Sequence, residues 1–214
     1  MPRFAEAIVA VCHSRPLNLG HVGWGYELPN GQWNCGAVEG ENWQGIFNGF
    51  WGRRVNNLDE VVATFGAMAR HGAPYENIKL MRVDPDVIPN PAYADKVSAW
   101  VSRQPYQLIN RNCMDSTYDI LQAFAVGYTR GWLPKPEDHW IPNDFFHHLP
   151  AISTIPVQHR SDSEADFELE DVLGKVPDAV AERPPWRDPD DPHYLPTHHQ
   201  KFRDQVRGRQ SADK

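Results

Sequence analysis

The most informative stretch of the chain is NRNCMDSTYDIL, residues 110–121. Asn112 is a residue type favoured as a helix N-cap, so it places Cys113 at the first position of a predicted helix and Asp115 at the third. The apolar residues that follow continue this helix toward Gly127, where we expect it to end. The stretch therefore predicts an amphipathic helix that begins with a cysteine.

A thiol at a helix start has a physical reason to be reactive. Unpaired backbone N–H groups and the positive end of the helix dipole converge there, and both favour the thiolate, which is the attacking form. The same turn, with Asn112 and Met114 on either side of the sulfur, can hold the oxyanion of an acyl intermediate. A small buried core residue is the alternative, since free cysteines are usually buried. The position of Cys113 alone does not decide between the two.

A thiolate mechanism also needs an imidazole that takes a proton and returns it to the leaving group. Among the ten histidines, His21 follows Gly20 and begins an apolar segment in which nothing local calls for a polar residue. His13, beside Cys12, is the alternative base. If His21 is the base, a ring nitrogen should lie within about 3–4 Å of the Cys113 sulfur.

The rest of the pattern predicts a mixed domain. Residues 5–13 and 78–83 are expected to be strands, and Asn30-Gly31 between two apolar segments is a strong hairpin signal. Further helices are expected to begin at three places: Asn57, where Glu60 completes a capping box, then Pro91 and Asn143. The sequence thus predicts an α+β fold in which a small antiparallel sheet packs against helices.

The composition excludes several classes of protein. The net charge of −7 argues against nucleic acid as the main partner, because phosphate binding needs a concentrated basic face. No segment approaches the roughly 18 apolar residues of a membrane span. The N-terminal segment is too short and too acidic for a signal peptide, so we expect synthesis in the cytoplasm without one. Three irregularly spaced cysteines do not indicate a disulfide framework.

The character of the chain changes near residue 157. Seven of the eight tryptophans precede residue 141, so residues 1–156 are expected to form the catalytic domain. Residues 157–214 are proline-rich and charged, and we expect a tail that is partly ordered or draped over the domain. The domain is expected to fold without the residues after about 160. Trp186, after two prolines, is either a docking anchor or a stray aromatic residue.

Three motifs in order resemble a known family: Gly20-His21-Val22-Gly23-Trp24 before a hairpin, Asn112-Cys113 at a helix start, and Ile141-Pro142-Asn143-Asp144-Phe145. They are similar to the circularly permuted papain-like hydrolases related to NlpC-type cell-wall peptidases, and lecithin:retinol acyltransferase-like enzymes share the order. The resemblance implies a papain-like permuted fold with the catalytic cysteine at a helix N-terminus. It also implies Cys113 as nucleophile and His21 as base.

That family usually supplies a third polar residue, on the strand after the histidine, to orient the imidazole. Counted from Asn30-Gly31, the position at which relatives often carry histidine falls at or near Cys35, so this sequence has no histidine there. A dyad of two residues is therefore one alternative. The polar candidates for a triad lie on the two strands of the hairpin: Asn34, Glu39 and Glu27.

The chemistry implied by the resemblance is amide hydrolysis through a thioester, without a cofactor. Its substrate class is the peptide stem of peptidoglycan, which fits a bacterial amidase or endopeptidase, or an antibacterial effector exported by a dedicated secretion system. An immunity or delivery protein would then be a partner. A deconjugating peptidase or an acyltransferase differs only in the acceptor of the acyl group.

Two other classes compete with an enzyme. One is a non-catalytic papain-like interaction module. The other is a metal-binding protein, with ligands from one of two sets: His139, His147 and His148, or His193, His198 and His199. Neither set has the paired Cys/His spacing of a structural zinc site, so we expect no metal.

Overall fold

A computed structural model describes residues 5–15, 18–83, 87–107, 111–125, 132–139, 141–159 and 179–190. Its strands are β1 (Glu6–Cys12), β2 (His21–Glu27), β3 (Trp33–Val38), β4 (Phe50–Val55), β5 (Asn77–Arg82) and β6 (Ser153–Pro156). Its α-helices are α1 (Leu58–Ala67), α2 (Pro91–Val101), α3 (Cys113–Phe124) and α4 (Pro142–His148). The strands form one antiparallel sheet in the order β4-β3-β2-β1-β5-β6. The expected α+β class is confirmed.

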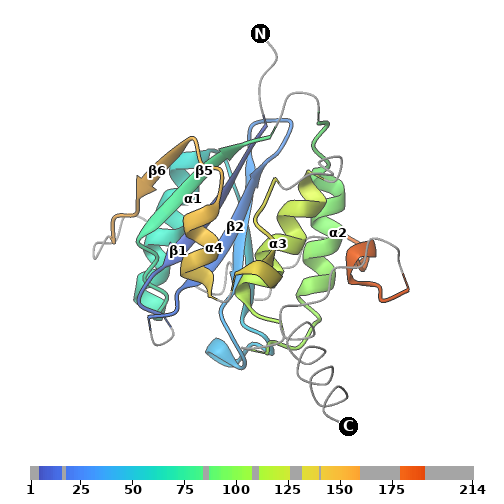
Figure 1. The fold of residues 1–214 in the computed structure, drawn as a ribbon. Coiled ribbons are helices and arrows are strands. Elements are labelled where there is room, and N and C mark those ends of the chain that lie inside the picture. The colour runs from blue at the N-terminus through green and yellow to red at the C-terminus, as the bar shows by residue number, and fades with distance from the viewer. Residues whose placement is uncertain are drawn as a thin grey trace.

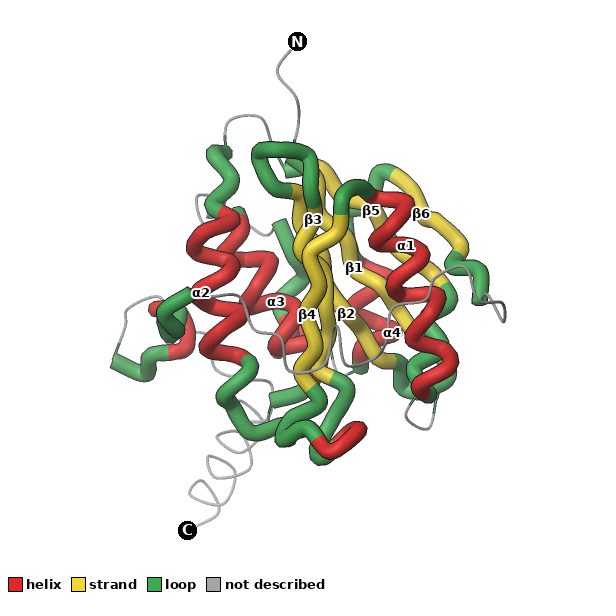
Figure 2. The backbone as a smooth tube through the Cα atoms, turned by 180° about the vertical axis from the view of Figure 1, so that it is seen from behind, coloured by secondary structure: helices red, strands yellow, loops and turns green. Residues whose placement is uncertain are grey.

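Helices cover both faces of the sheet. In Figure 1, α4 and α3 lie in front of the strands and α2 packs beside α3, and Figure 2 shows α1 on the opposite face. Side chains alternate between the two faces of a strand, so Trp24 and Tyr26 of β2 join the core under α3, with Tyr26 stacked on Phe124 at 5.1 Å between ring centroids. Trp33 and Cys35 of β3 join the core under α1. None of the described helices is long and apolar enough to cross a lipid bilayer.

The predicted hairpin is present, and its register sets up the site. The Leu28 N–H donates to the Gln32 carbonyl at 2.7 Å, and Gly31 takes the positive φ of 85° that the turn requires. Each β2–β3 pair, from Glu27↔Trp33 to Gly23↔Ala37, is symmetric about Asn30. The same register places the start of β2 opposite the residue that follows β3.

The helix starts are capped as the sequence predicted, with one difference. Asn112 and Asp115 form a complete capping box at α3. At α1, Asn57 accepts the Glu60 N–H, but the Glu60 carboxylate accepts the N–H of Asn56 instead of returning to Asn57. The expected helix near Asn143 begins one residue earlier, at Pro142. The predicted stop at Gly127 lies outside the described residues, and α3 itself ends at Phe124.

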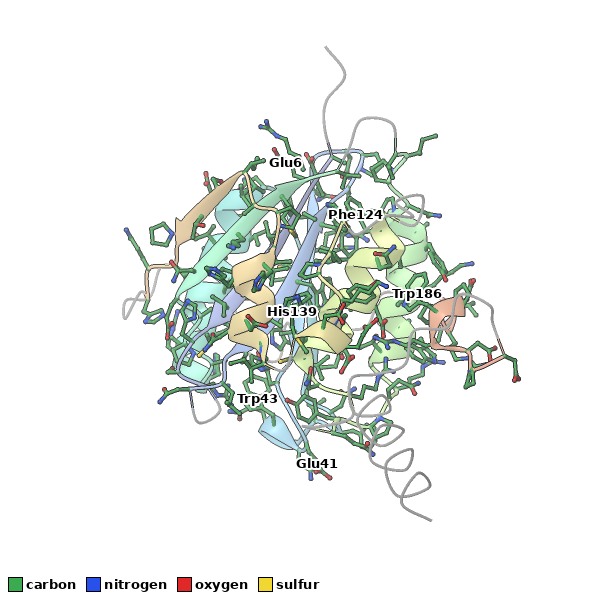
Figure 3. All side chains as sticks on the ribbon, viewed as in Figure 1. Glu6, Glu41, Trp43, Phe124, His139 and Trp186 are labelled. Carbon is green, nitrogen blue, oxygen red and sulfur yellow. The ribbon has the colours of Figure 1, made fainter. Side chains whose placement is uncertain are left out.

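Part of the C-terminal segment belongs to the core. Trp186, in the short 3-10 helix η6 (Pro185–Arg187), is 7% exposed and lies in the hydrophobic cluster with α2 and α3 (Figure 3). Its ring meets Tyr93 edge-on at 6.5 Å, and its Nε1 donates to Asp119 at 2.9 Å. Of the two alternatives for Trp186, the structure therefore favours the docking anchor, while folding of the domain without the residues after about 160 stays a prediction.

Candidate active site

Cys113 is the first residue of α3, and the cap in front of it selects which backbone groups remain available. Asn112 Oδ1 accepts the N–H groups of Met114 at 2.9 Å and Asp115 at 3.3 Å. The Cys113 N–H has no hydrogen-bond partner among the described residues. Met114 was a predicted oxyanion-binding residue, but Asn112 already occupies its N–H. The Cys113 N–H is the donor left for an oxyanion in this turn.

His21 lies at the beginning of β2 and interacts with Cys113. Both residues are 2% exposed. Burial alone would lower the pKa of His21, but the charge and hydrogen bond of Cys113, together with Glu39, raise that pKa to about 10. The charges around the imidazole therefore favour its protonated form.

Glu39 approaches the same imidazole from the next strand. Its Oε2 lies 3.1 Å from His21 Nε2, but no described acceptor is aligned with that nitrogen for a hydrogen bond, so the contact is an ion pair. The other oxygen, Oε1, accepts from Trp51 Nε1 at 2.7 Å and from the Tyr75 hydroxyl at 2.8 Å. Arg15 Nη1 lies 3.3 Å from Oε2. A buried carboxylate thus has partners at both oxygens, as burial of a charge requires.

The charge state of Glu39 follows from these contacts. Burial raises the pKa of Glu39, but the charge of His21 and the hydrogen bonds from Trp51 and Tyr75 lower it by a larger amount. The pKa of Glu39 therefore lies below its ordinary value. Glu39 therefore remains ionised and stabilises the imidazolium. Its position follows from the hairpin register, since His21 and Glu39 lie equally far from Asn30 on opposite sides of the turn.

Asn34, the other triad candidate in the hairpin, lies in a different network. Its Nδ2 donates to Asp95 at 2.7 Å and to the Tyr26 hydroxyl at 3.3 Å, and its Oδ1 accepts from Arg54 at 2.9 Å. The structure does not bring Asn34 to His21. Glu27 lies at the opposite end of β2 from His21. Of the three polar candidates, only Glu39 reaches the imidazole.

The alternative base is engaged elsewhere. His13 Nδ1 lies 2.8 Å from Asn143 Oδ1, and its Nε2 lies 3.4 Å from Asn77 Nδ2. This histidine fastens the end of β1 to α4 and β5. Its place in the structure explains its polarity without a role in proton transfer.

The two other cysteines, Cys12 and Cys35, differ in their position relative to His21. Cys35 lies in the core under α1, where burial raises its pKa to about 12. Cys12 lies directly opposite His21 in the β1–β2 ladder, with its Sγ 3.5 Å from Ser14 Oγ. Cys12 is therefore the thiol against which the role of Cys113 must be tested.

The Gly20-His21 and Pro142-Asn143 motifs meet in space. Gly20 has a φ of 94°, and a Cβ atom there would lie 2.4 Å from Asn143 Oδ1. The Asn143 side chain donates to the carbonyls of His13 at 3.2 Å and Asn18 at 3.0 Å. Glycine is required at position 20 because the first turn of α4 packs directly against the chain that leads into His21.

The side chains of Cys113 and His21 are almost fully buried in this conformation. Two surface hollows of about 630 Å³ and 290 Å³ lie elsewhere, one beside α1 and β6 and one beside Leu28 and Pro91. Burial and the charges of Cys113 and Glu39 raise the pKa of the half-buried Tyr106.

Comparison with known proteins gives no relative. No protein-family model matches the chain, and neither the curated proteins nor the solved structures contain a match. The features that bear on function are therefore the geometry of His21, Glu39 and Cys113 and the order of the motifs.

The buried pair predicts a specific pH dependence of stability. The pKa of His21 rises on folding from an ordinary 6.5 to about 10, so its contribution is complete below pH 6.5 and is lost as the pH rises through about 10. Glu39 affects stability at acidic pH. Because its pKa is lowered on folding, its contribution is present above pH 4.5 and is lost as the pH falls.

We expect the unfolding free energy of the wild type to fall between pH 6.5 and 10 by about 2 kcal/mol more than that of His21→Gln. Urea denaturation at both pH values measures this difference. Parallel pH profiles of the two proteins would contradict the pairing.

Proposed function

We propose that this protein is a cysteine hydrolase of the permuted papain-like type that cleaves an amide bond through a thioester. The proposal is carried by one observation: Cys113, at the start of α3, interacts electrostatically with the buried His21, and Glu39 Oε2 lies 3.1 Å from Nε2 of the same imidazole. These residues come from three separate segments of the chain. A cysteine that only filled the core would need neither the imidazole nor the carboxylate.

The geometry supports a complete catalytic cycle. The Cys113 thiolate adds to the amide carbon, and the Cys113 N–H stabilises the oxyanion that forms. Collapse of this intermediate breaks the C–N bond, and the leaving amine takes a proton from His21. Water then attacks the thioester after giving a proton to His21, and the carboxylic acid is released with the thiolate restored. Glu39 orients the imidazole and balances its charge throughout.

The substrate class comes from the motif order. The histidine strand β2 precedes the cysteine helix α3, as in the permuted papain-like hydrolases, and the Pro142-Asn143 turn packs beside the histidine as a third element. We therefore propose the peptide stem of peptidoglycan as substrate, in an antibacterial effector exported by a dedicated secretion system and paired with an immunity protein. A deconjugating peptidase or an acyltransferase would use the same thioester with a different acceptor.

Mass spectrometry of the reaction products tests the proposal. The full chain is incubated with peptidoglycan fragments and with model peptides, and we expect new amine and carboxyl ends at one amide bond. Cys113→Ala should release no fragments, while Cys12→Ala serves as the matched thiol control and should release the same fragments as the wild type. Release of fragments by Cys113→Ala, or their loss in Cys12→Ala alone, would assign the nucleophile to another residue.

Thiol labelling separates an enzyme from a non-catalytic module, an alternative favoured by the 2% exposure of Cys113. In the folded protein, iodoacetamide should label Cys113 faster than Cys12 and Cys35 near neutral pH, because an imidazolium lies beside the sulfur. Faster labelling of Cys12 would show that the nucleophile is misassigned. Labelling of Cys113 only at the rate of global unfolding would favour the non-catalytic module.

A further inference from the structure

A second cluster of chemically active side chains lies on the outer side of α4. His139 precedes the helix (Figure 3), and Asp144 and His148 follow one turn apart on it. His139 Nδ1 lies 2.6 Å from Asp144 Oδ2, and His148 Nδ1 lies 3.3 Å from Asp144 Oδ1. The two imidazole rings are 4.7 Å apart between centroids. Two imidazoles and one carboxylate therefore face one another outside the candidate active site.

We propose that His139, Asp144 and His148 form a binding site for a divalent transition-metal ion of the zinc class. One donor atom from each residue lies within 4.8 Å of the others. Donor atoms bound to a single tetrahedral zinc ion at 2.0–2.2 Å lie about 3.3 Å apart. Shifts of about 1 Å in the side chains bring the three donors to that spacing.

The exposure of the three side chains allows such an adjustment. The side chain of His139 is 13% exposed and thus held by its surroundings, whereas Asp144 and His148 are 42% and 52% exposed. His148 Nδ1 lies 2.9 Å from the Asp144 carbonyl oxygen. Rotation of this exposed ring would break that contact and turn the nitrogen toward the ion. The remaining coordination position faces solvent, where water completes a four-coordinate site.

The donor set also indicates the class of ion. Imidazole nitrogen suits zinc, copper and nickel, whereas magnesium and calcium prefer sites made only of oxygen ligands. One carboxylate and two neutral imidazoles leave one positive charge on a divalent ion, and the exposed surface solvates that charge. The ion takes no part in the proposed hydrolysis. Its effect is to fasten the segment before α4 to the helix whose first turn packs against Gly20.

Zinc titration of the metal-free full chain tests the site, with no affinity tag present. Isothermal titration calorimetry should show one equivalent of Zn²⁺ bound, and the melting temperature should rise with Zn²⁺ because the ion binds the folded state. Mg²⁺ should do neither. Asp144→Asn and His148→Gln should each weaken Zn²⁺ binding by at least about tenfold.

The matched controls are histidines outside the cluster. His147→Gln changes an exposed ring on the same helix, 5.2 Å from the ring of His148, and the double variant His198→Gln/His199→Gln removes two histidines near the C-terminus. Both controls should keep the wild-type affinity. Equal affinity in the wild type and Asp144→Asn, equal loss in His147→Gln, or no Zn²⁺ binding by the wild type would each overturn the proposal.

Discussion

Replacing His21 by glutamine is expected to lower kcat/KM for amide hydrolysis by about 10³-fold, because the variant loses both the proton donor for the leaving amine and the base that activates water. Steady-state kinetics on the peptide identified by mass spectrometry measure the loss. His13→Gln is the matched control: this ring bonds to Asn143 and Asn77, so its kcat/KM should stay within about twofold of the wild type. A larger loss in His13→Gln than in His21→Gln would show that His13, which follows β1, is the base.

The same kinetics distinguish a triad from a dyad. Glu39→Gln should cost less than His21→Gln, since the carboxylate acts through the imidazole. The double variant should be no slower than His21→Gln alone, because residues that act as a unit are strongly non-additive. Independent, multiplying losses would show that Glu39 has only a structural role in the core.

Arg187→Met is expected to lower the unfolding free energy by about 3 kcal/mol, because it leaves buried carboxylates with fewer partners. Arg187 Nε contacts both oxygens of Asp119, at 2.8 and 3.1 Å, and its Nη2 lies 3.4 Å from Asp115. Burial would lower the pKa of Arg187, but these two carboxylates raise it, so the guanidinium stays charged. Urea unfolding measures the change.

Arg183→Ala is the control for Arg187→Met. Arg183 forms an exposed ion pair with Asp188 in the same segment, and such pairs contribute about 0–1 kcal/mol. A chain ending after residue 160 should lose at least as much stability as Arg187→Met, since it lacks Trp186 as well. Equal stability of Arg187→Met and Arg183→Ala would mean that the segment lies on the surface without supporting α3.

Local signals were sufficient for most of the fold. The caps at Asn57 and Asn112, the turn at Asn30-Gly31 and the apolar periodicity predicted α1, α3 and the β2–β3 hairpin. The edge strands β4 and β6 were missed. In β4, Phe50 and Trp51 are both buried on opposite faces, so no alternation marks the strand, and β6 is short and largely exposed. β6 owes its conformation to pairing with β5, which is far away in sequence, and no local pattern reveals that pairing.

The site was predicted in part for a similar reason. The helix start at Cys113 and the glycine before His21 carry local signals, and Glu39 follows from hairpin symmetry once the turn is located. Trp51 and Tyr75, which hold Glu39, come from a missed strand and from a loop, and nothing near them in sequence indicates the contact. The partners of Arg187 had one available signal: Asp115 and Asp119 are two carboxylates one turn apart on a helix that is almost entirely buried.

The symmetry of the hairpin about Asn30 also limits how this protein can diversify. Inserting or deleting one residue in the turn from Leu28 to Gln32 would shift β3 by one register position against β2 and send Glu39 to the other face of the sheet. The turn can therefore vary in residue type but not freely in length. In distant homologues that keep the ion pair, we expect equal numbers of residues on the two sides of the turn, or a β-bulge wherever that equality is broken.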